Sequence, residues 1–323
     1  MGRYTVRREL GRGVFSSVFL CHDEQSDRNV AVKAMRALEE SQEIFKEETE
    51  ILRKIEGGSP SHCISVIEAF HDETTGSDFI VTELMEMNLR TFMEEKMSKM
   101  SSSKRAEIVN LLLKQMSQAL ERLKGKKIIH ADLKPDNIFL TEEPLVFKLG
   151  DFGSSISMND ENVAPAFNYR VSRFYRAPEV ILGNQVGRGI DIWALGYTLF
   201  EIYTGDVLFD GEDNNEMIEK MIRTLGKIPS TIIEKGGLAS LEHFSKKGND
   251  YVFRKKLGRQ PDSLSRGIRE RIAEKTEKDI PDNREERNAT KEMSRNIALF
   301  VETCTTLDPL SREKKFEAAM EKN

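Results

Sequence analysis

The stretch 128–153 limits what this chain can fold into more than any other part of it. It reads Ile-Ile-His-Ala-Asp-Leu-Lys-Pro-Asp-Asn-Ile-Phe-Leu and, after a short linker, Phe-Lys-Leu-Gly-Asp-Phe-Gly. Phosphoryl transfer requires a carboxylate facing the attacking hydroxyl, a cation on the moving phosphoryl group and two oxygen ligands for magnesium. The stretch supplies these chemical types in order, as Asp132, Lys134, Asn137 and Asp151. It therefore predicts a catalytic centre for phosphoryl transfer.

A glycine-containing turn near the start of the chain predicts a cover for a phosphate. Two β-rich runs, Thr5–Leu10 and Val18–Cys21, flank a turn that contains Gly11 and Gly13, with Ser16 where a third glycine could stand. A hairpin of this kind can lay backbone N–H groups over a phosphate. A Gly-x-Gly or an Asp-Phe-Gly by itself is more often an ordinary loop or turn. The ordered combination of both favours nucleotide binding.

A lysine and a glutamate between these motifs are predicted to form an ion pair. Lys33 ends the strand-like run Val-Ala-Val-Lys, and the spacing of apolar residues predicts a helix over Ser41–Ile55. Glu48 falls on the apolar stripe of that helix, whereas the other glutamates fall on faces that water reaches. Because a buried charge is costly unless it is paired, we expect Lys33 and Glu48 to meet and to hold the α- and β-phosphates of ATP.

The order of strand and helix signals predicts an α+β protein of two lobes. Strand signals dominate the beginning of the chain, and helical periodicity dominates after it. A length of 323 residues with 38% hydrophobic and 32% charged residues is ordinary for a globular protein of this size. The predicted parts are a small β-rich lobe with one regulatory helix over 1–82, a hinge over 83–88, a larger mostly helical lobe over 89–323, an activation segment over 151–179 and an insertion over about 206–295.

Two helices of the large lobe can be predicted with their roles. One presents an apolar face over 108–123, and we expect Gly125 to cap its end. The other, over 189–205, is apolar nearly all round and should be buried. Asp191 near its start is too polar to serve packing. We expect Asp191 to accept hydrogen bonds from backbone N–H groups around residues 130–131.

The chain carries no sequence signal for a membrane or for secretion. No apolar run reaches the roughly eighteen residues that span a bilayer, and no signal peptide or myristoylation pattern is found at the start. Three distant cysteines favour a reducing compartment, and no histidine near them completes metal-ligand spacing. These features predict an intracellular, soluble protein with no membrane contact. We also expect the protein to be monomeric.

The stretch 227–271 departs from the charge of the whole chain. It contains eleven Lys and Arg against five Asp and Glu, a net of +6 in a protein of formal net charge −5. Such a stretch could dock acidic or phosphorylated partners, could bind RNA, or could be a solvated face. No aromatic platform accompanies the charge, which favours the solvated face and argues against direct nucleic-acid binding.

Together these motifs resemble a eukaryotic protein kinase of the cyclin-dependent, mitogen-activated, glycogen-synthase and Cdc-like group. The resemblance extends from Gly11 to Arg312, and the run Val-Ser-Arg-Phe-Tyr-Arg-Ala-Pro-Glu over 171–179 is typical of the group. Four features are similar to the pre-mRNA-processing factor four kinases, a splicing subfamily next to the dual-specificity tyrosine-regulated kinases. They are Gly-x-Gly-Val-Phe-Ser, His-Ala-Asp in place of His-Arg-Asp, Met87-Asn88-Leu89-Arg90 and Leu225-Gly226-Lys227-Ile228-Pro229.

The resemblance implies a serine/threonine kinase that uses ATP and Mg²⁺. Asp132 would orient the substrate hydroxyl and accept its proton, while Asn137 and Asp151 would hold magnesium. Lys134 would reach the γ-phosphate over a short serine or threonine side chain, an arrangement that tyrosine kinases replace. Thr82 is smaller than the usual residue at the gatekeeper position. The adenosine pocket would be lined by Gly11, Gly13, Val18, Ala31, Lys33, Thr82, Glu83, Met85 and Asn88.

The resemblance also implies regulation through the activation segment. Tyr169 stands at the phosphotyrosine position of this kinase branch, and Arg173 and Arg176 would hold its phosphate. They would do so alone, because Ala131 replaces an arginine that other kinases use for that purpose. The alternative for Tyr169 is an ordinary loop aromatic. Ser172, also in the segment, is expected to hydrogen-bond the catalytic aspartate and lysine rather than to be modified.

The remaining expectations concern packing and substrates. Glu179 should pair with Arg312 and close the large lobe, and Arg176 should turn a backbone carbonyl so that proline is accepted after the target residue. The resemblance implies splicing proteins as substrates and a nuclear location. Two alternatives stay open. The chain could be a tyrosine-regulated or Cdc-like kinase that acts outside splicing, or a pseudokinase scaffold, which would require loss of residues such as Lys33 or Asp132.

Overall fold

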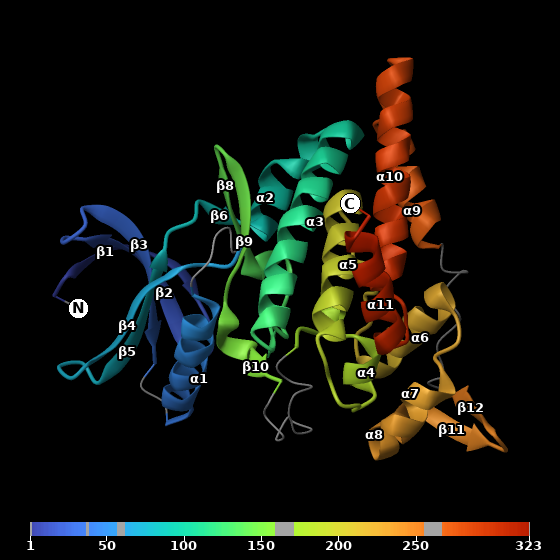
Figure 1. The fold of residues 1–323 in the computed structure, drawn as a ribbon, viewed down its shortest axis with the longest axis horizontal. Coiled ribbons are helices and arrows are strands. Elements are labelled where there is room, and N and C mark those ends of the chain that lie inside the picture. Colours follow the sequence, from blue (N-terminus) through green and yellow to red (C-terminus); the bar gives the residue numbers. More distant parts are fainter. Residues whose placement is uncertain (1, 37–38, 57–61, 159–170, 255–266, 323) are drawn as a thin grey trace.

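The computed structural model describes residues 2–36, 39–56, 62–158, 171–254 and 267–322. A β-sheet lobe and a larger helical lobe lie side by side, with the N-terminus at the outer edge of the sheet lobe (Figure 1). The predicted two-lobe α+β architecture is confirmed. Among the described residues, none of the helices has the length and apolar character needed to cross a membrane.

The small lobe is one antiparallel sheet with a helix on it. The strands follow the order β1-β2-β3-β5-β4. Alternate residues of the central strands, including Val30, Val32 and Val81, are buried on one face, as expected where one side of a sheet meets a core. Helix α1 contacts β3, β4 and β5. The elements are β1 (Tyr4–Arg12), β2 (Ser16–Asp23), β3 (Arg28–Met35), α1 (Glu39–Ile55), β4 (Val66–Asp72) and β5 (Ser77–Glu83).

Helix α5 is the centre of the large lobe. Every residue of it is buried, as the sequence predicted, and α3, α9, α10 and α11 pack around it (Figure 1). The helices are α2 (Leu89–Glu95), α3 (Ser102–Gly125), α4 (Pro178–Ile181), α5 (Gly189–Thr204), α6 (Asn214–Leu225), α7 (Ser230–Lys235), α8 (Gly237–His243), α9 (Ile268–Lys278), α10 (Arg284–Cys304) and α11 (Pro309–Met320).

Short strands position the catalytic stretch between the lobes. The hairpin β8–β9 pairs Ile138 with Leu149, so the residues just outside it, Asn137 and Gly150, are neighbours. Gly150 donates its backbone N–H to the carbonyl of Asn137 (2.9 Å). The strands are β6 (Met87–Asn88), β7 (Ile128–Ile129), β8 (Ile138–Glu142), β9 (Leu145–Leu149) and β10 (Ile156–Ser157), with β6 beside β8 and β7 beside β10.

The described residues of the region 206–295 form mostly helices and one strand hairpin. The region begins with α6, α7 and α8 and a hairpin of β11 (Phe244–Lys247) and β12 (Asp250–Phe253) at one end of the large lobe (Figure 1). Its approximate limit at 295 falls inside α10, which packs on α3 and α5. Part of the basic stretch, over 255–266, lies outside the described residues.

The predicted cap of α3 is wrong. Gly125 is helical, and the C-cap is Lys126, whose backbone N–H points to the carbonyls of Arg122, Leu123 and Lys124. The left-handed conformation falls on Lys127 (φ 55°). Because the N–H of Lys126 already satisfies the last carbonyls, the helix end needs no left-handed glycine at 125.

Candidate active site

The loop that carries Asp132 is held by the start of helix α5. The buried carboxylate of Asp191 accepts hydrogen bonds from the backbone nitrogens of His130 (2.7 Å) and Ala131 (2.8 Å), which are the contacts that the sequence predicted. Burial raises the pKa of Asp191, and these donors oppose that change. Ala131 has a φ of 70°, a left-handed conformation that costs free energy for a residue with a side chain. The two hydrogen bonds stabilise this strained turn.

The imidazole of His130 joins this loop to the Gly-Asp-Phe segment. Asp132 donates its backbone N–H to Nδ1 (3.3 Å), so Nε2 carries the hydrogen that reaches the carbonyl of Gly150 (3.0 Å). The buried Phe152 ring meets the imidazole edge to face, with centroids 5.0 Å apart. The sequence assigned no role to this side chain. Two of its partners, Gly150 and Phe152, lie about twenty residues away, and no local pattern marks them.

Two side chains and one backbone N–H hold the Asp132 carboxylate. Lys134 Nζ (2.7 Å) and Asn137 Nδ2 (3.0 Å) donate to one oxygen, and the backbone N–H of Ser172 (3.2 Å) donates to the other. Lys134 Nζ also donates to Ser172 Oγ (2.8 Å). The structure thus shows the expected contacts of Ser172 with both catalytic-loop residues. A carboxylate held in this way has a fixed direction in the cleft.

Lys33, Glu48 and Asp151 form a charged cluster where the two lobes meet. Lys33 Nζ lies 2.8 Å from both Glu48 oxygens and 3.1 Å from Asp151 Oδ1. Burial acts to lower the pKa of Lys33, but the two carboxylates more than offset this and raise it. The same lysine is the main cause that lowers the pKa of Asp151. Lys33 is therefore a cation at any pH near neutrality.

Two glycines shape this cluster by leaving space. At Gly150 an added Cβ would lie 2.7 Å from Ile64 Cγ1 and 2.9 Å from a Phe139 ring carbon, so no side chain fits. At Gly153 an added Cβ would lie 3.4 to 3.5 Å from charged atoms of Lys33, Glu48 and Asp151. Asp151 between them has a φ of 57°. Because neither position has a side chain, the turn can lie close to Ile64 and Phe139 and also close to the charged atoms of the cluster.

The residues predicted to hold magnesium offer the right donor atoms. Mg²⁺ prefers oxygen ligands, and Asp151 supplies a carboxylate whose side chain is 48% exposed. Asn137 uses its amide nitrogen for Asp132, which leaves its carbonyl oxygen for a cation. In the described parts of the chain, no cluster of three or more His, Cys, Asp or Glu could hold a metal by itself. This donor set fits an ion that takes its other ligands from nucleotide phosphates and water.

The residues predicted to line the adenosine pocket align across the sheet. Val18 lies opposite Lys33, and Ala31 lies opposite Thr82, so positions 31 and 33 share one face of β3. Gly11 lies opposite Val18. The structure thus brings the turn, the central strand and the hinge strand together over one surface. Gly13 closes the turn by donating its backbone N–H to the carbonyl of Ser16 (2.8 Å).

The predicted hinge makes contacts with both lobes. Glu83 accepts two hydrogen bonds from Lys148 (2.8 and 2.6 Å) and one from the backbone of Ser65 (2.7 Å). Asn88 caps α2 by accepting the backbone N–H of Thr91 (2.9 Å). Because the cap uses the side-chain oxygen of Asn88, a contact of Asn88 with a ribose would be made by its amide nitrogen.

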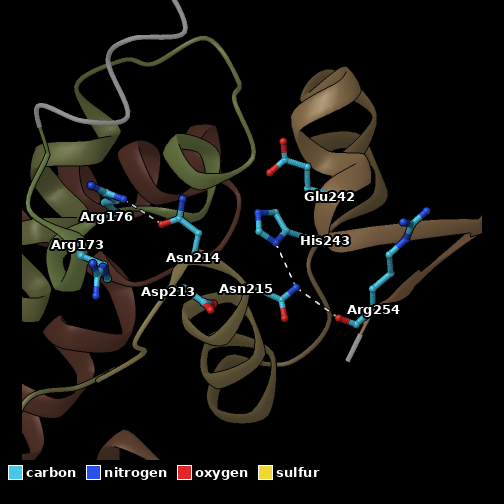
Figure 2. A pocket seen from close by; sticks show the side chains of 8 residues that line it. All are labelled: Arg173, Arg176, Asp213, Asn214, Asn215, Glu242, His243 and Arg254. Atoms are coloured by element: carbon cyan, nitrogen blue, oxygen red, sulfur yellow. Dashed lines mark hydrogen bonds between the residues drawn. The ribbon is translucent and has the colours of Figure 1, made fainter. Parts of the chain in front are cut away.

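The arginines of the activation segment face a cavity of about 560 Å³ (Figure 2). Arg176 donates to the carbonyl of Val171 (2.8 Å) and to Asn214 Oδ1 (2.9 Å), and Arg173 donates to the carbonyl of Glu212. The other wall of the cavity carries His243 and Arg254, from α8 and the end of the β11–β12 hairpin. Tyr169 lies outside the described residues.

Glu179 and Arg312 form the predicted ion pair inside the large lobe. Two hydrogen bonds of 2.6 and 3.0 Å join them, and both side chains are buried. The pair connects the end of the activation segment to α11.

The structure also shows a polar cluster that sequence reasoning missed. Arg90 of α2 meets Glu201 and Tyr175, which are 111 and 85 positions away in the chain. Arg90 stood in a motif quoted only for its resemblance. No local signal points to its partners, because they lie on elements that only tertiary packing brings near.

Comparison with known proteins shows one family over nearly the whole chain. A family model described as protein kinase domain matches residues 4–322. The chain is 33% identical over 330 aligned residues to the serine/threonine-protein kinase prpf4B of Dictyostelium discoideum, an alignment that covers 98% of this chain and 39% of that protein.

Two further relatives have the same level of identity. The serine/threonine-protein kinase prp4 of Schizosaccharomyces pombe is 33% identical over 245 residues, covering 75% of this chain and 50% of the relative. A putative dual specificity tyrosine-phosphorylation-regulated kinase 3 homolog of Drosophila melanogaster is 33% identical over 248 residues, covering 76% and 29%. The chain thus spans half or less of the length of these relatives.

Proposed function

Because the chain belongs to the protein kinase family, we propose that it transfers the γ-phosphoryl group of ATP to serine and threonine side chains of proteins. The observation that carries this proposal is the cluster around Asp132. Lys134, Asn137 and Ser172 hold its carboxylate in one direction, and the Lys33–Glu48–Asp151 cluster stands across the cleft. Of the residues whose loss would make a pseudokinase, none has been replaced.

In the proposed mechanism, Asp132 orients the acceptor hydroxyl and takes its proton while the hydroxyl oxygen bonds to the γ-phosphorus and the bond to ADP breaks. Lys134 stabilises the charge on the transferred group from its place beside Asp132. Lys33, fixed by Glu48, positions the α- and β-phosphates. Asn137 and Asp151 would hold Mg²⁺, which supplies positive charge to the phosphate oxygens when bound.

The test of this proposal is phosphate transfer to serine and threonine peptides by the parent protein and by Asp132→Asn. We expect kcat to fall by about 10²–10⁴-fold while ATP affinity stays nearly unchanged, because Asp132 acts on the hydroxyl and not on the nucleotide. Asp282→Asn, at a fully exposed position, is the matched control and should behave as the parent protein. Equal turnover in Asp132→Asn would contradict the proposal.

We propose that protein substrates are splicing proteins and that the enzyme acts in the nucleus. The support is the similarity to the prp4 and prpf4B kinases together with the four features of this sequence that resemble the splicing subfamily. The alternative, a tyrosine-regulated kinase acting outside splicing, is supported by the equal identity to the Drosophila relative. These two functions can be distinguished by phosphoproteomics of cells treated with an inhibitor that enters the pocket behind Thr82. Loss of phosphate from splicing proteins is expected, and loss confined to other proteins would favour the alternative.

We also propose that the protein phosphorylates its own Tyr169 and that Arg173 and Arg176 then hold the phosphate. The support is that both arginines line one cavity (Figure 2) and follow Tyr169 by four and seven positions in the chain. Mass spectrometry of protein made in bacteria should find phosphotyrosine at 169 in the parent and none in Asp132→Asn. Modification in both proteins, or full activity of Tyr169→Phe, would refute this proposal.

The contact of Arg176 with the Val171 carbonyl supports a preference for proline after the target residue. That hydrogen bond engages the carbonyl within the chain. In the proposed complex, a substrate residue without an N–H would therefore leave no acceptor unsatisfied. A peptide array with every residue at that position should show proline accepted or favoured. Rejection of proline would contradict this expectation.

For the basic stretch 227–271 we propose docking of an acidic or phosphorylated segment of protein substrates to a monomeric kinase. The alternative that the sequence favours is a solvated face without a partner. The exposed Lys247 of β11 lies in this stretch. Lys247→Glu should raise KM for an intact protein substrate and leave KM for a short peptide unchanged. Lys314→Glu, an equally exposed change on α11, is the control. Equal effects of both changes would show that only total charge matters.

A further inference from the structure

A second cavity, of about 540 Å³, opens beside the catalytic cluster. Lys134, Asn137 and Ser172 form one part of its wall, so it is continuous with the proposed site of the acceptor hydroxyl. Another part of the wall carries two carboxylates, Asp136 and Glu201. Carboxylates beside an acceptor site are suited to a guanidinium or ammonium group of a bound peptide.

The chain places its own guanidinium between these two carboxylates. Arg90 donates to Glu201 (2.6 Å), to the hydroxyl of Tyr175 (2.9 Å) and, more loosely, to Asp136 (3.4 Å). The Tyr175 hydroxyl donates to the other oxygen of Glu201 (2.6 Å). Both oxygens of Glu201 are therefore engaged by groups of the protein itself.

The exposure of the three charged groups shows how the cavity is presented to a substrate. Glu201 is almost fully buried, with 4% of its side chain exposed, so it requires a partner. Arg90 and Asp136 are 29% and 45% exposed, so both stand at the cavity surface. An incoming cation would find one open carboxylate, with the Arg90 guanidinium already beside it and repelling it. Removal of Arg90 would leave two carboxylates and no cation between them.

We propose that Arg90 fills, from within the chain, a subsite that would otherwise select a basic side chain of the protein substrate. Arg90 is thus a specificity-determining residue, and its presence removes any requirement for arginine or lysine near the target serine. Substrates would then be selected through other contacts, such as the one with the residue that follows the target serine. This inference rests on the proposed kinase function.

The experiment is a positional peptide array built on a serine-proline core, with arginine or glutamine placed at one position at a time on both sides of the serine. It compares the parent protein with Arg90→Gln and with Arg90→Gln/Asp136→Asn. The parent should show no preference for arginine. Arg90→Gln should gain a preference of about tenfold at one position, the scale of one charge-assisted hydrogen bond, and the double variant should lose it. Lys96→Gln, which removes a partly exposed ion pair with Glu142 at the end of the same helix, is the control.

Several outcomes would overturn the inference. If Arg90→Gln folds, phosphorylates the core peptide and keeps the parent profile, Arg90 is only a structural connection between α2 and α5. If Arg90→Gln does not fold, Asp136→Asn in the parent protein decides. Neither the parent nor Asp136→Asn should prefer arginine, because Arg90 already excludes a substrate cation. A preference for arginine in the parent that Asp136→Asn removes would overturn the inference. Absence of any transfer by the parent protein would instead refute the proposed function, and the inference with it.

Discussion

The Lys33–Glu48 pair at the cleft and the Glu179–Arg312 pair inside the large lobe use the same chemistry in different surroundings. Lys33 bridges two carboxylates, and one of them, Asp151, is half exposed. Arg312 is fully buried and donates also to the backbone carbonyls of Thr306, Leu307 and Gly189. Its guanidinium lies 4.9 Å from the centre of the Trp193 ring.

The difference lies in whether the pair keeps an open side. At the cleft, an incoming nucleotide and metal can take over part of the contacts of Lys33 and Asp151, so the pair can change partners. Inside the large lobe, every nitrogen of the Arg312 guanidinium already donates to protein oxygens. That pair can hold the lobe together but cannot exchange contacts. We therefore expect changes at the cleft to affect activity and changes at the inner pair to affect stability.

The largest expected effect is on the stability of the large lobe. Arg312→Met should lower the free energy of unfolding by about 3–5 kcal/mol, because it leaves the Glu179 carboxylate buried without a cation. Arg312→Met/Glu179→Gln should recover part of the loss. Denaturant unfolding measures both. Exposed ion pairs contribute up to about 1 kcal/mol. If the free energy of unfolding of Arg312→Met falls by less than that, the inner pair does not differ from an exposed one and the comparison is wrong.

The next effect concerns activity. Lys33→Ala should lower kcat/KM about 100-fold, near 2.7 kcal/mol of transition-state stabilisation, because the nucleotide phosphates lose their positioned cation. The free energy of unfolding should fall less than in Arg312→Met, by about 1–3 kcal/mol, because the buried Glu48 loses its cation while water can still reach Asp151. Steady-state kinetics and denaturant unfolding on the same sample check both values. Full kcat/KM would show that Lys33 is only a strand lysine.

A smaller effect is expected for the partner of that lysine. Glu48→Gln should lower kcat/KM about tenfold, because the amide oxygen can still accept from Lys33 while the charge that fixes it is lost. Glu50→Gln is the matched control, since Glu50 stands exposed on the same helix and pairs with Lys54. Equal losses in both variants would mean that only helix charge matters, and the predicted role of Glu48 would be wrong.

The smallest expected effect is the pH dependence of stability that comes from His243, a buried side chain that is not bound to an opposite charge among the described residues. Burial lowers the pKa of His243 below its ordinary 6.5, and Asn215 donates to its Nδ1 (3.2 Å). The unfolded chain therefore binds a proton more readily than the folded one, so stability should fall as pH drops below about 6.5. His243→Gln should reduce that fall by less than about 1 kcal/mol, measured by unfolding at pH 5.5 and 7.5. The same slope in both proteins would assign the loss to other groups.

Most of what could be predicted from the sequence lies close together in the chain or rests on periodicity. Two distant contacts were predicted on other grounds, those of Asp191 from its polarity in an apolar helix and the Glu179–Arg312 pair with the resemblance to kinases. Asp132, Lys134 and Asn137 fall within one short loop, so their contacts follow from its geometry. Periodicity placed Glu48 on the inner face of α1, and the need to pair a buried charge then pointed to Lys33. The resemblance to kinases was needed for the roles of these residues. The prediction of a cap at Gly125 was wrong because the end of a helix depends on which group satisfies its last carbonyls, and here that group is the backbone N–H of Lys126.

The sequence by itself thus determined the two-lobe α+β fold, the catalytic loop and the inward face of α1. Only the tertiary structure showed that Arg90 lies between Asp136 and Glu201, and that the His130 ring connects the catalytic loop to Gly150. The physical reason is the range of the interactions. Local spacing and burial act along one element and leave a pattern in the sequence. The contacts that only the tertiary structure showed join residues 20 to 111 positions apart. They depend on how whole elements pack together, and many sequences satisfy that packing without a recognisable local signal.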